Sequence, residues 1–196
     1  MHPSDRILKA GRRLFFAHGF ESVSTDALAR EAGVSKATLY KYFPNMRVVL
    51  KAVTEAEADS FQADVLRDVN SPDELRDALT LYGANLLVFL NQPDVLQFSA
   101  VMFEEARRHP EAAEMFYTAA YGRVLSMVAD LFERARVKGI YVSAVPSPEL
   151  AELLVGMWEG LPMVRAHLKL TRPPFPRPND WAGKAVSLLF DGLLAR

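Results

Sequence analysis

The side chains best placed for recognition chemistry lie in one short segment near the start of the chain. Residues 35–38 read SKAT, which sets a hydroxyl, an ammonium, a methyl and a second hydroxyl in succession. Small polar side chains at the start of a helix can reach base edges in the major groove of DNA, which is about 12 Å wide. Lys36 can donate to guanine or to a phosphate, and Thr38 can bond a base edge or touch a thymine methyl group. The predicted base-contacting residues are Ser35, Lys36, Ala37 and Thr38.

The residues around this segment suit contacts with phosphates, which fix the register of a protein on DNA without reading its sequence. Helix starts at Ser24 or Thr25 and at Asn45 would present free backbone N–H groups to an anion. The alternative for Lys41 and Arg47 is a solvated surface, and for Tyr42 it is core packing. The predicted phosphate contacts are Ser24, Thr25, Tyr40, Lys41, Tyr42 and Arg47.

The elements that must position these side chains are predicted to be a helix-turn-helix. Residues 25–43 read TDALAREAGVSKATLYKYF. Two helices that cross steeply over a short turn need a small residue at the crossing and a residue with positive φ in the turn. Ala29 and Gly33 meet these needs. The inward positions are filled by apolar or aromatic residues, namely Leu28, Ala32, Val34, Leu39 and Tyr42.

Charge is distributed unevenly along the 196 residues. Residues 1–53 carry nine Lys and Arg against four Asp and Glu, a net charge of +5, whereas the remainder carries 14 against 20, a net charge of −6. This asymmetry indicates a basic module that meets a polyanion, followed by an acidic body that does not. We therefore predict a DNA-binding domain over residues 1–50 and a helical effector-binding and dimerisation domain over residues 51–196.

Apolar residues recur at helical spacing along most of the chain, which predicts an all-α protein of about nine helices. Half of the residues are hydrophobic, and no apolar run approaches the ~20 residues that a membrane helix needs. We expect a cytoplasmic protein with no membrane partner. The predicted helices after the turn cover about 46–68, 72–91, 93–109, 111–138, 147 onward and 180 to the end, with a loop at 140–145 and a proline-rich connector at 172–180.

The body is rich in aromatic residues and methionine, which build apolar pockets between bundle helices but more often fill a core. Taken together, some of them are predicted to line a cavity for a mostly apolar ligand. These residues are Phe61, Tyr82, Phe89, Phe98, Met102, Phe103, Phe116, Tyr117, Tyr121, Met157 and Trp158.

The last two helices are predicted to form the interface of a homodimer, with two helices from each subunit. Two glycines one turn apart permit close helix approach, and an apolar stripe follows on the final helix. The predicted interface residues are Gly156, Gly160, Ala182, Ala185, Val186, Leu189 and Leu193, and Pro162 should kink or end the helix nearby.

Residues 5–53 resemble the DNA-binding domain of the tetracycline-repressor (TetR) family. The resemblance rests on LFFAHGF at 14–20, on LAREAGVSKATLYKYF at 28–43 and on the aromatic-rich lead into the next helix. FEEARRHPEAAEMFY at 103–117 also resembles a segment of one C-terminal subgroup. One departure stands out: the family commonly has Lys shortly after the aromatic-Pro pair, where this chain has Met46 followed by Arg47.

The resemblance implies a homodimeric transcriptional regulator, usually a repressor, that leaves a palindromic operator when a small molecule enters the body. A regulator gated by a protein partner, or without an effector, is the alternative, and an enclosed cavity would argue against it. An all-helical enzyme would need clustered ionisable groups in a cleft. The sequence shows no such cluster, no cysteine, no His pair at metal-ligand spacing and no cofactor motif.

Overall fold

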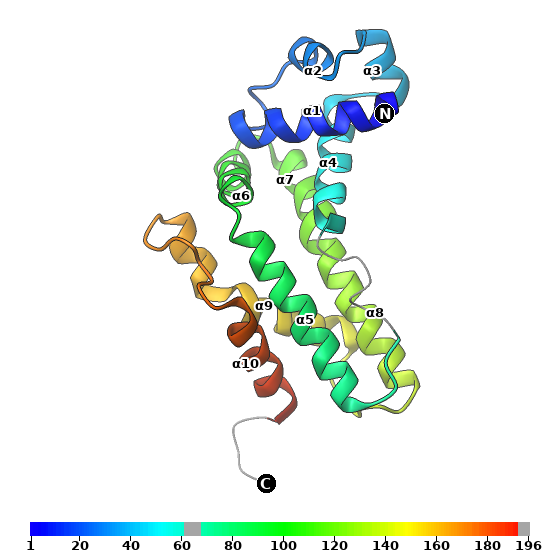
Figure 1. Cartoon of the computed structure of the whole chain (residues 1–196), viewed down its shortest axis with the longest axis vertical. Helices are drawn as coiled ribbons and strands as arrows, with labels where there is room; N and C mark the ends of the chain where they lie inside the picture. Colours follow the sequence, from blue (N-terminus) through cyan, green and yellow to red (C-terminus); the bar gives the residue numbers. More distant parts are fainter. Residues whose placement is uncertain (61–67, 192–196) are drawn as a thin grey trace. The chain divides into compact units, whose positions relative to one another are not determined.

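The computed structural model describes residues 1–60 and 68–191, and the regular structure within these ranges is entirely helical (Figure 1). This confirms the predicted all-α class. Two compact units are present: Met1–Asp59 with Pro93–Gly122, and Ser60–Gln92 with Arg123–Arg196. The predicted boundary at residue 50 divides the chain by function, into a DNA-binding part and an effector-binding part. The compact units do not test that boundary, so it stays a prediction.

The first unit begins with α1 (Pro3–His18), α2 (Thr25–Ala32), α3 (Lys36–Tyr42) and α4 (Met46–Ser60). Their boundaries follow from local chemistry. The hydroxyl of Ser24 accepts a hydrogen bond from the N–H of Ala27, which settles the cap of α2 in favour of Ser24 over Thr25. Asn45 caps α4 in the same way, accepting from the N–H of Val48 at 3.0 Å. Gly19 ends α1 with a φ of 79°.

The same unit also contains α6 (Pro93–Glu105), α7 (Pro110–Tyr117) and the π-helical turn η1 (Thr118–Gly122). Helix α6 packs on α1, where the rings of Phe16 and Phe98 stack with centroids 4.3 Å apart. Arg12 of α1 pairs with Asp94 of α6 and with Glu57 of α4, each at 2.8 Å. Stacked rings and a shared guanidinium therefore hold α6 against the helix that supports α2 and α3.

The second unit consists of α5 (Pro72–Leu90), α8 (Arg123–Val137), α9 (Ser147–His167) and α10 (Pro178–Asp191). Helix α10 packs along α5, and α8 packs along α9. Trp158 is fully buried, and its indole lies so close to Gly83 that a β-carbon at position 83 would stand 2.4 Å from a ring atom. Gly83 therefore allows α5 and α9 to approach at this point.

The structure refines several predicted boundaries. The predicted helix over 111–138 is α7, η1 and α8 in succession, with π-helical geometry at 118–122. Helix α6 ends at Glu105 rather than near 109, and α10 begins at Pro178. Helix α9 kinks at Gly160, where φ is 35°, two residues before the proline that the sequence singled out. Helix α4 is described as far as Ser60; residues 61–67 of the predicted fourth helix lie outside the described residues, and Asp68, its predicted end, is not helical.

No helix among the described residues is long and apolar enough to cross a membrane by itself, although α5 and α6 taken together pass that test by length and composition.

Candidate nucleic-acid interface

The turn between α2 and α3 has the geometry of a helix-turn-helix. Gly33 adopts the left-handed conformation, with φ 63° and ψ 41°. The N–H of Val34 donates to the carbonyl of Ala29 at 3.0 Å, which closes the C-terminus of α2. The hydroxyl of Ser35 then accepts from the N–H of Thr38 and starts α3. Leu39 is almost completely buried and anchors α3 to the helices beneath it.

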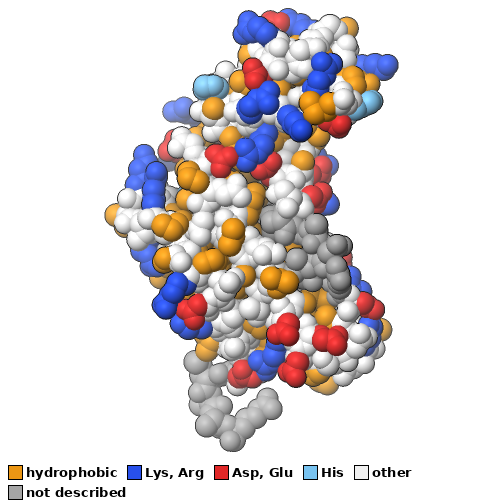
Figure 2. Space-filling model, viewed as in Figure 1, with side chains coloured by type: hydrophobic (Ala, Val, Ile, Leu, Met, Phe, Trp, Pro, Cys, Tyr) orange, Lys and Arg blue, Asp and Glu red, His pale blue; other side chains and the backbone are white. Residues whose placement is uncertain are grey.

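The outer face of α3 presents the residues predicted to contact bases. Ser35, Lys36 and Ala37 are exposed, and Thr38 is partly buried. The Thr38 hydroxyl lies 2.9 Å from the Ser35 hydroxyl, so these two groups are already aligned with each other. Figure 2 shows Lys and Arg side chains on the surface that α1, α2 and α3 form. The structure thus brings the four residues to one surface, while their contact with bases stays a prediction.

Lys36 has an intramolecular partner that its place in the sequence does not reveal. Its ammonium Nζ lies 2.7 Å from Oδ1 of Asp26, in the first turn of α2. The hydrogen bond with Asp26 raises the pKa of Lys36, so the side chain stays charged. Asp26 therefore orients Lys36, and any other anion that approaches Lys36 must compete with this carboxylate.

The predicted phosphate contacts also lie on this side of α2 and α3. The hydroxyls of Tyr40 and Thr25 are 3.5 Å apart, which places the exposed Tyr40 over the start of α2. Tyr42 is partly buried, and its ring meets the His2 ring edge-on, with centroids 5.2 Å apart. Lys41 is exposed beside Tyr42, with its ammonium 6.0 Å from the ring centroid. Tyr42 therefore combines packing against His2 with partial exposure, and its contact with a phosphate stays a prediction.

Arg47 is exposed at the start of α4, but it is not free. Its guanidinium forms an ion pair with Glu111 in the first turn of α7. Met46, which precedes Arg47, is partly buried and carries no charge. Glu111 is distant in sequence, so no spacing rule could have connected it with Arg47.

The predicted pocket residues fall into two groups, one in each unit. In the first unit Phe98 and Met102 are buried, Phe116 and Tyr121 are partly buried, and Phe103 and Tyr117 are exposed. The rings form a connected series: Phe98 meets Phe116 at 5.6 Å between centroids, Phe116 meets Tyr121 at 6.2 Å, and Tyr121 stacks on Tyr117 at 5.6 Å. Through Phe16, this series reaches α1.

In the second unit Tyr82 and Trp158 are fully buried, whereas Phe89 and Met157 are only partly buried. The indole N–H of Trp158 is buried without a hydrogen-bond partner in the described part of the chain. An unsatisfied buried donor of this kind costs about 1–3 kcal/mol. Phe61 lies outside the described residues. A ligand cavity built from these residues stays a prediction.

The predicted dimer residues also separate into two kinds. Ala182, Ala185 and Val186 are buried within the protomer, on the helix that packs against α5. Gly156 and Gly160 are exposed, Leu189 is partly buried, and Leu193 lies outside the described residues. Ala182, Ala185 and Val186 therefore belong to the core of the single chain. The interface itself stays a prediction.

Comparison with known families gives two adjacent matches. Residues 7–53 match the family described as bacterial regulatory proteins, tetR family. Residues 77–191 match the C-terminal domain of the AefR-like transcriptional repressors.

Among curated proteins, the chain is similar to the nucleoid occlusion factor SlmA of Haemophilus influenzae. The two are 28% identical over 102 residues, which cover 50% of this chain and 47% of SlmA. The chain thus spans about half the length of that relative.

Two solved structures resemble the whole chain. A TetR transcriptional regulator from Agrobacterium tumefaciens aligns with a TM-score of 0.80 at 23% identity, covering 97% of this chain and 94% of the other. The flavonoid-responsive regulator FrrA aligns with a TM-score of 0.70 at 25% identity, covering 99% and 98%.

Proposed function

Because the chain belongs to the TetR family of bacterial regulatory proteins, we propose that it is a homodimeric repressor that leaves a palindromic operator when a small, mostly apolar ligand binds. The family consists of transcriptional regulators, not enzymes. The observation that carries the proposal is the exposed start of α3. There Ser35, Lys36 and Ala37 project from a helix that Gly33 and Leu39 hold in helix-turn-helix geometry.

Base reading is assigned to Lys36 and Thr38, with Ala37 allowing close approach of the backbone. Phosphate contacts are assigned to Tyr40, Lys41 and Arg47, together with the N–H groups at the starts of α2 and α4. Lys36 and Arg47 each have an acidic partner within the protein. DNA must therefore displace or share these ion pairs.

A second copy of the chain is proposed because a single small module buries little surface on DNA. Exposed apolar residues follow one another along α9 and recur on α10, which supports an interface on these helices. They include Leu153 at 56% exposure and Val164 at 50% on α9, Leu168 at 64% directly after α9, and Leu188 at 49% on α10. Gly156 lies on the same helix, and a β-carbon there would meet nothing within 4 Å in the single chain.

The ligand is proposed to contact the aromatic residues of the body. A response to flavonoids, as the name of FrrA states for that protein, would suit an aromatic-rich site. The series of rings from Phe98 to Tyr117, which lies within the first unit, supports this assignment.

Coupling to DNA is proposed to run through α6 and α7, which belong to the same compact unit as the helix-turn-helix. Phe98 stacks on Phe16 of α1, and Glu111 pairs with Arg47 of α4. Displacement of α6 or α7 would therefore disturb the helices that carry the DNA-binding surface. A ligand can shift this equilibrium only by binding one arrangement more tightly than the other.

The proposal is tested by fluorescence anisotropy on labelled DNA from the region flanking the protein's own gene, with a scrambled duplex as control. We expect selective binding with two protomers per site and a steep dependence on salt. Compounds can then be screened for release of the complex. Selective binding that no small molecule reverses, but that a protein from the same cell does, would favour the alternative of a regulator gated by a partner.

A further inference from the structure

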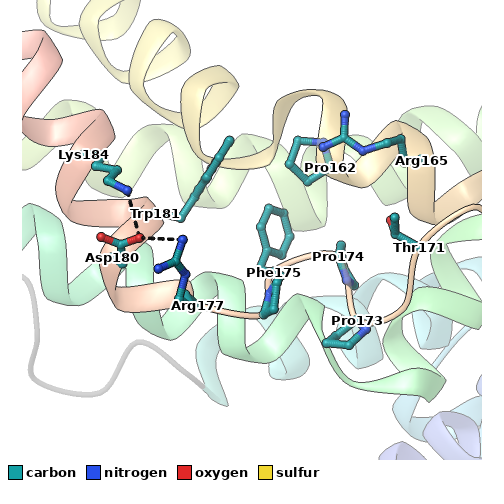
Figure 3. Close-up of a pocket in the computed structure, with 11 residues that line it drawn as sticks. Pro162, Arg165, Thr171, Pro173, Pro174, Phe175, Arg177, Asp180, Trp181 and Lys184 are labelled. Carbon is teal, nitrogen blue, oxygen red and sulfur yellow. Dashed lines mark hydrogen bonds and ion pairs between the residues drawn. The ribbon is translucent and has the colours of Figure 1, made fainter.

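A cavity of about 340 Å³ lies in the second unit, where the connector between α9 and α10 meets those helices (Figure 3). None of its residues belongs to the predicted effector pocket. Pro162, Pro174 and Phe175 give it an apolar floor, and all three side chains are buried. Its volume falls in the range of small-molecule sites, which is about 300–1,000 Å³.

Two hydrogen-bonded contacts hold the cavity in shape. The side chain of Asn91, at the end of α5, donates to the carbonyl of Phe175 at 2.8 Å and accepts from its N–H at 3.0 Å. The indole N–H of Trp181 donates to the carbonyl of Trp158 at 2.8 Å, so the wall that Trp181 forms is also fixed. In Figure 3 the rings of Phe175 and Trp181 extend from the connector and from α10 toward α9. Such a cavity needs little ordering when a ligand enters.

The rim of the cavity is cationic. Arg165, Arg177 and Lys184 line it, against the single acid Asp180, so the lining carries a net charge of +2. Lys184 lies 3.0 Å and Arg177 3.7 Å from the Asp180 carboxylate, and these neighbours lower the pKa of Asp180. Arg165 makes no ion pair with any residue that the structure describes, and its side chain runs beside Pro162 (Figure 3). One cation is thus available over an apolar floor.

We propose that this cavity binds a small carboxylate with a flat apolar body. The body would lie against Phe175 and the exposed face of Trp181, because aromatic faces favour stacked or edge contacts with flat groups. The carboxylate would pair with Arg165, whose planar guanidinium offers two parallel donors. Asp180 opposes this ligand by its charge and by occupying Lys184 and Arg177. None of the residues that line this site belongs to the DNA-binding surface or to the aromatic residues assigned to the effector, and Trp181 is joined to Trp158 by a hydrogen bond to its backbone carbonyl.

The test uses 2-naphthoate as the probe and 2-naphthalenemethanol as its uncharged counterpart, titrated into the full-length protein by calorimetry without DNA. Arg165→Ala should weaken naphthoate binding about twofold to fivefold, the range expected for one solvent-exposed ion pair. Asp180→Asn should tighten it by about twofold or more, because Lys184 and Arg177 are released. Neither variant should change the affinity for the alcohol. Arg123→Ala, which removes one cation elsewhere in the second unit, should leave both affinities unchanged.

Arg165→Ala should weaken naphthoate binding and Asp180→Asn should tighten it, so the two variants together give a decisive test. Naphthoate affinity that is equal in the wild type, Arg165→Ala and Asp180→Asn would place the probe elsewhere and overturn the proposal. If a second copy of the chain fills the cavity instead, naphthoate will not bind, and Arg165→Ala will change the dimer dissociation constant in sedimentation experiments. That result would also overturn it. Thermal unfolding of each variant verifies that the exposed substitutions leave the fold intact.

Discussion

Arg47 in the first turn of α4 is ion-paired with Glu111 in the first turn of α7. The pair joins a residue assigned to phosphate binding with a helix outside the helix-turn-helix, within one compact unit. We propose that the Glu111 carboxylate on α7 and a DNA phosphate compete for the Arg47 guanidinium. Such competition would connect the position of α7 with affinity for DNA.

Glu111→Gln should release Arg47 and tighten DNA binding about twofold to fivefold, because an exposed ion pair contributes up to about 1 kcal/mol. The slope of log K against log salt should steepen by about 1 if Arg47 then engages a phosphate. Anisotropy titrations at several salt concentrations measure both quantities. Glu114→Gln is the matched control, since Glu114 is an exposed acid on the same helix. Equal tightening by both variants would mean that only the overall charge matters.

Lys36→Ala should weaken operator binding by about 1–3 kcal/mol and reduce discrimination between operator and scrambled DNA, as expected for a base contact. Asp26→Asn should act in the opposite direction, because the carboxylate 2.7 Å from Lys36 is removed. Tyr42→Phe should weaken binding to both DNAs to a smaller extent. Unchanged affinity in Lys36→Ala and Tyr42→Phe alike would refute the assignment of this surface to DNA.

Gly83→Ala should destabilise the protein by about 1–3 kcal/mol, because a β-carbon would stand 2.4 Å from the Trp158 ring in a packed core. Gly156→Ala should stabilise the single chain by about 0.5–1 kcal/mol, since the site is helical and open. Urea unfolding measures both changes. If Gly156 lies in the dimer interface, the same substitution should weaken the dimer in sedimentation experiments. A Gly83→Ala protein as stable as the wild type would show that the packing of α5 on α9 is looser than the structure indicates.

Burial raises the pKa of Glu159 from its ordinary value of 4.5 to about 7. The folded protein then holds this proton more tightly than the unfolded chain does, so the free energy of unfolding should fall as pH rises from about 4.5 to about 7. Glu159→Gln should remove this part of the pH dependence and be relatively more stable at pH 8. Urea unfolding across this pH range measures the effect, with the exposed Glu152→Gln on the same helix as control. A pH profile of Glu159→Gln that parallels the wild type would show that Glu159 does not cause this pH dependence.

The sequence predicted the local parts of the fold well, because their determinants lie within a few residues of each other. Gly33 in the turn, Ser35 before α3 and Asn45 before α4 act on backbone groups two or three positions away. The spacing of Gly33 and Ser35 also predicted that the start of α3 is exposed. A kink in this part of α9 was predicted, but it was attributed to Pro162, whereas the distorted backbone lies at Gly160.

The contacts that depend on tertiary packing could not be predicted in this way. Glu111 reaches Arg47 across 64 residues of sequence, and no periodicity connects them. The apolar stripe of α10 fits a dimer interface and a core position equally well in sequence, and only packing against α5 shows that Ala182 and Val186 are buried in the single chain. The cavity beside Trp181 is lined in part by the proline-rich connector. Hydrophobic periodicity identifies only helices and strands, so it gave no sign that this connector would form a cavity.

Selective recognition of DNA by the exposed face of α3 can be tested by selection of genomic fragments. Fragments retained by purified protein at physiological salt would be sequenced, in parallel with those retained by Lys36→Ala. We expect the wild type to enrich a small set of fragments that share a two-fold symmetric motif, and Lys36→Ala to lose this enrichment. Retention of all fragments in proportion to their length, with the same profile for both proteins, would contradict it.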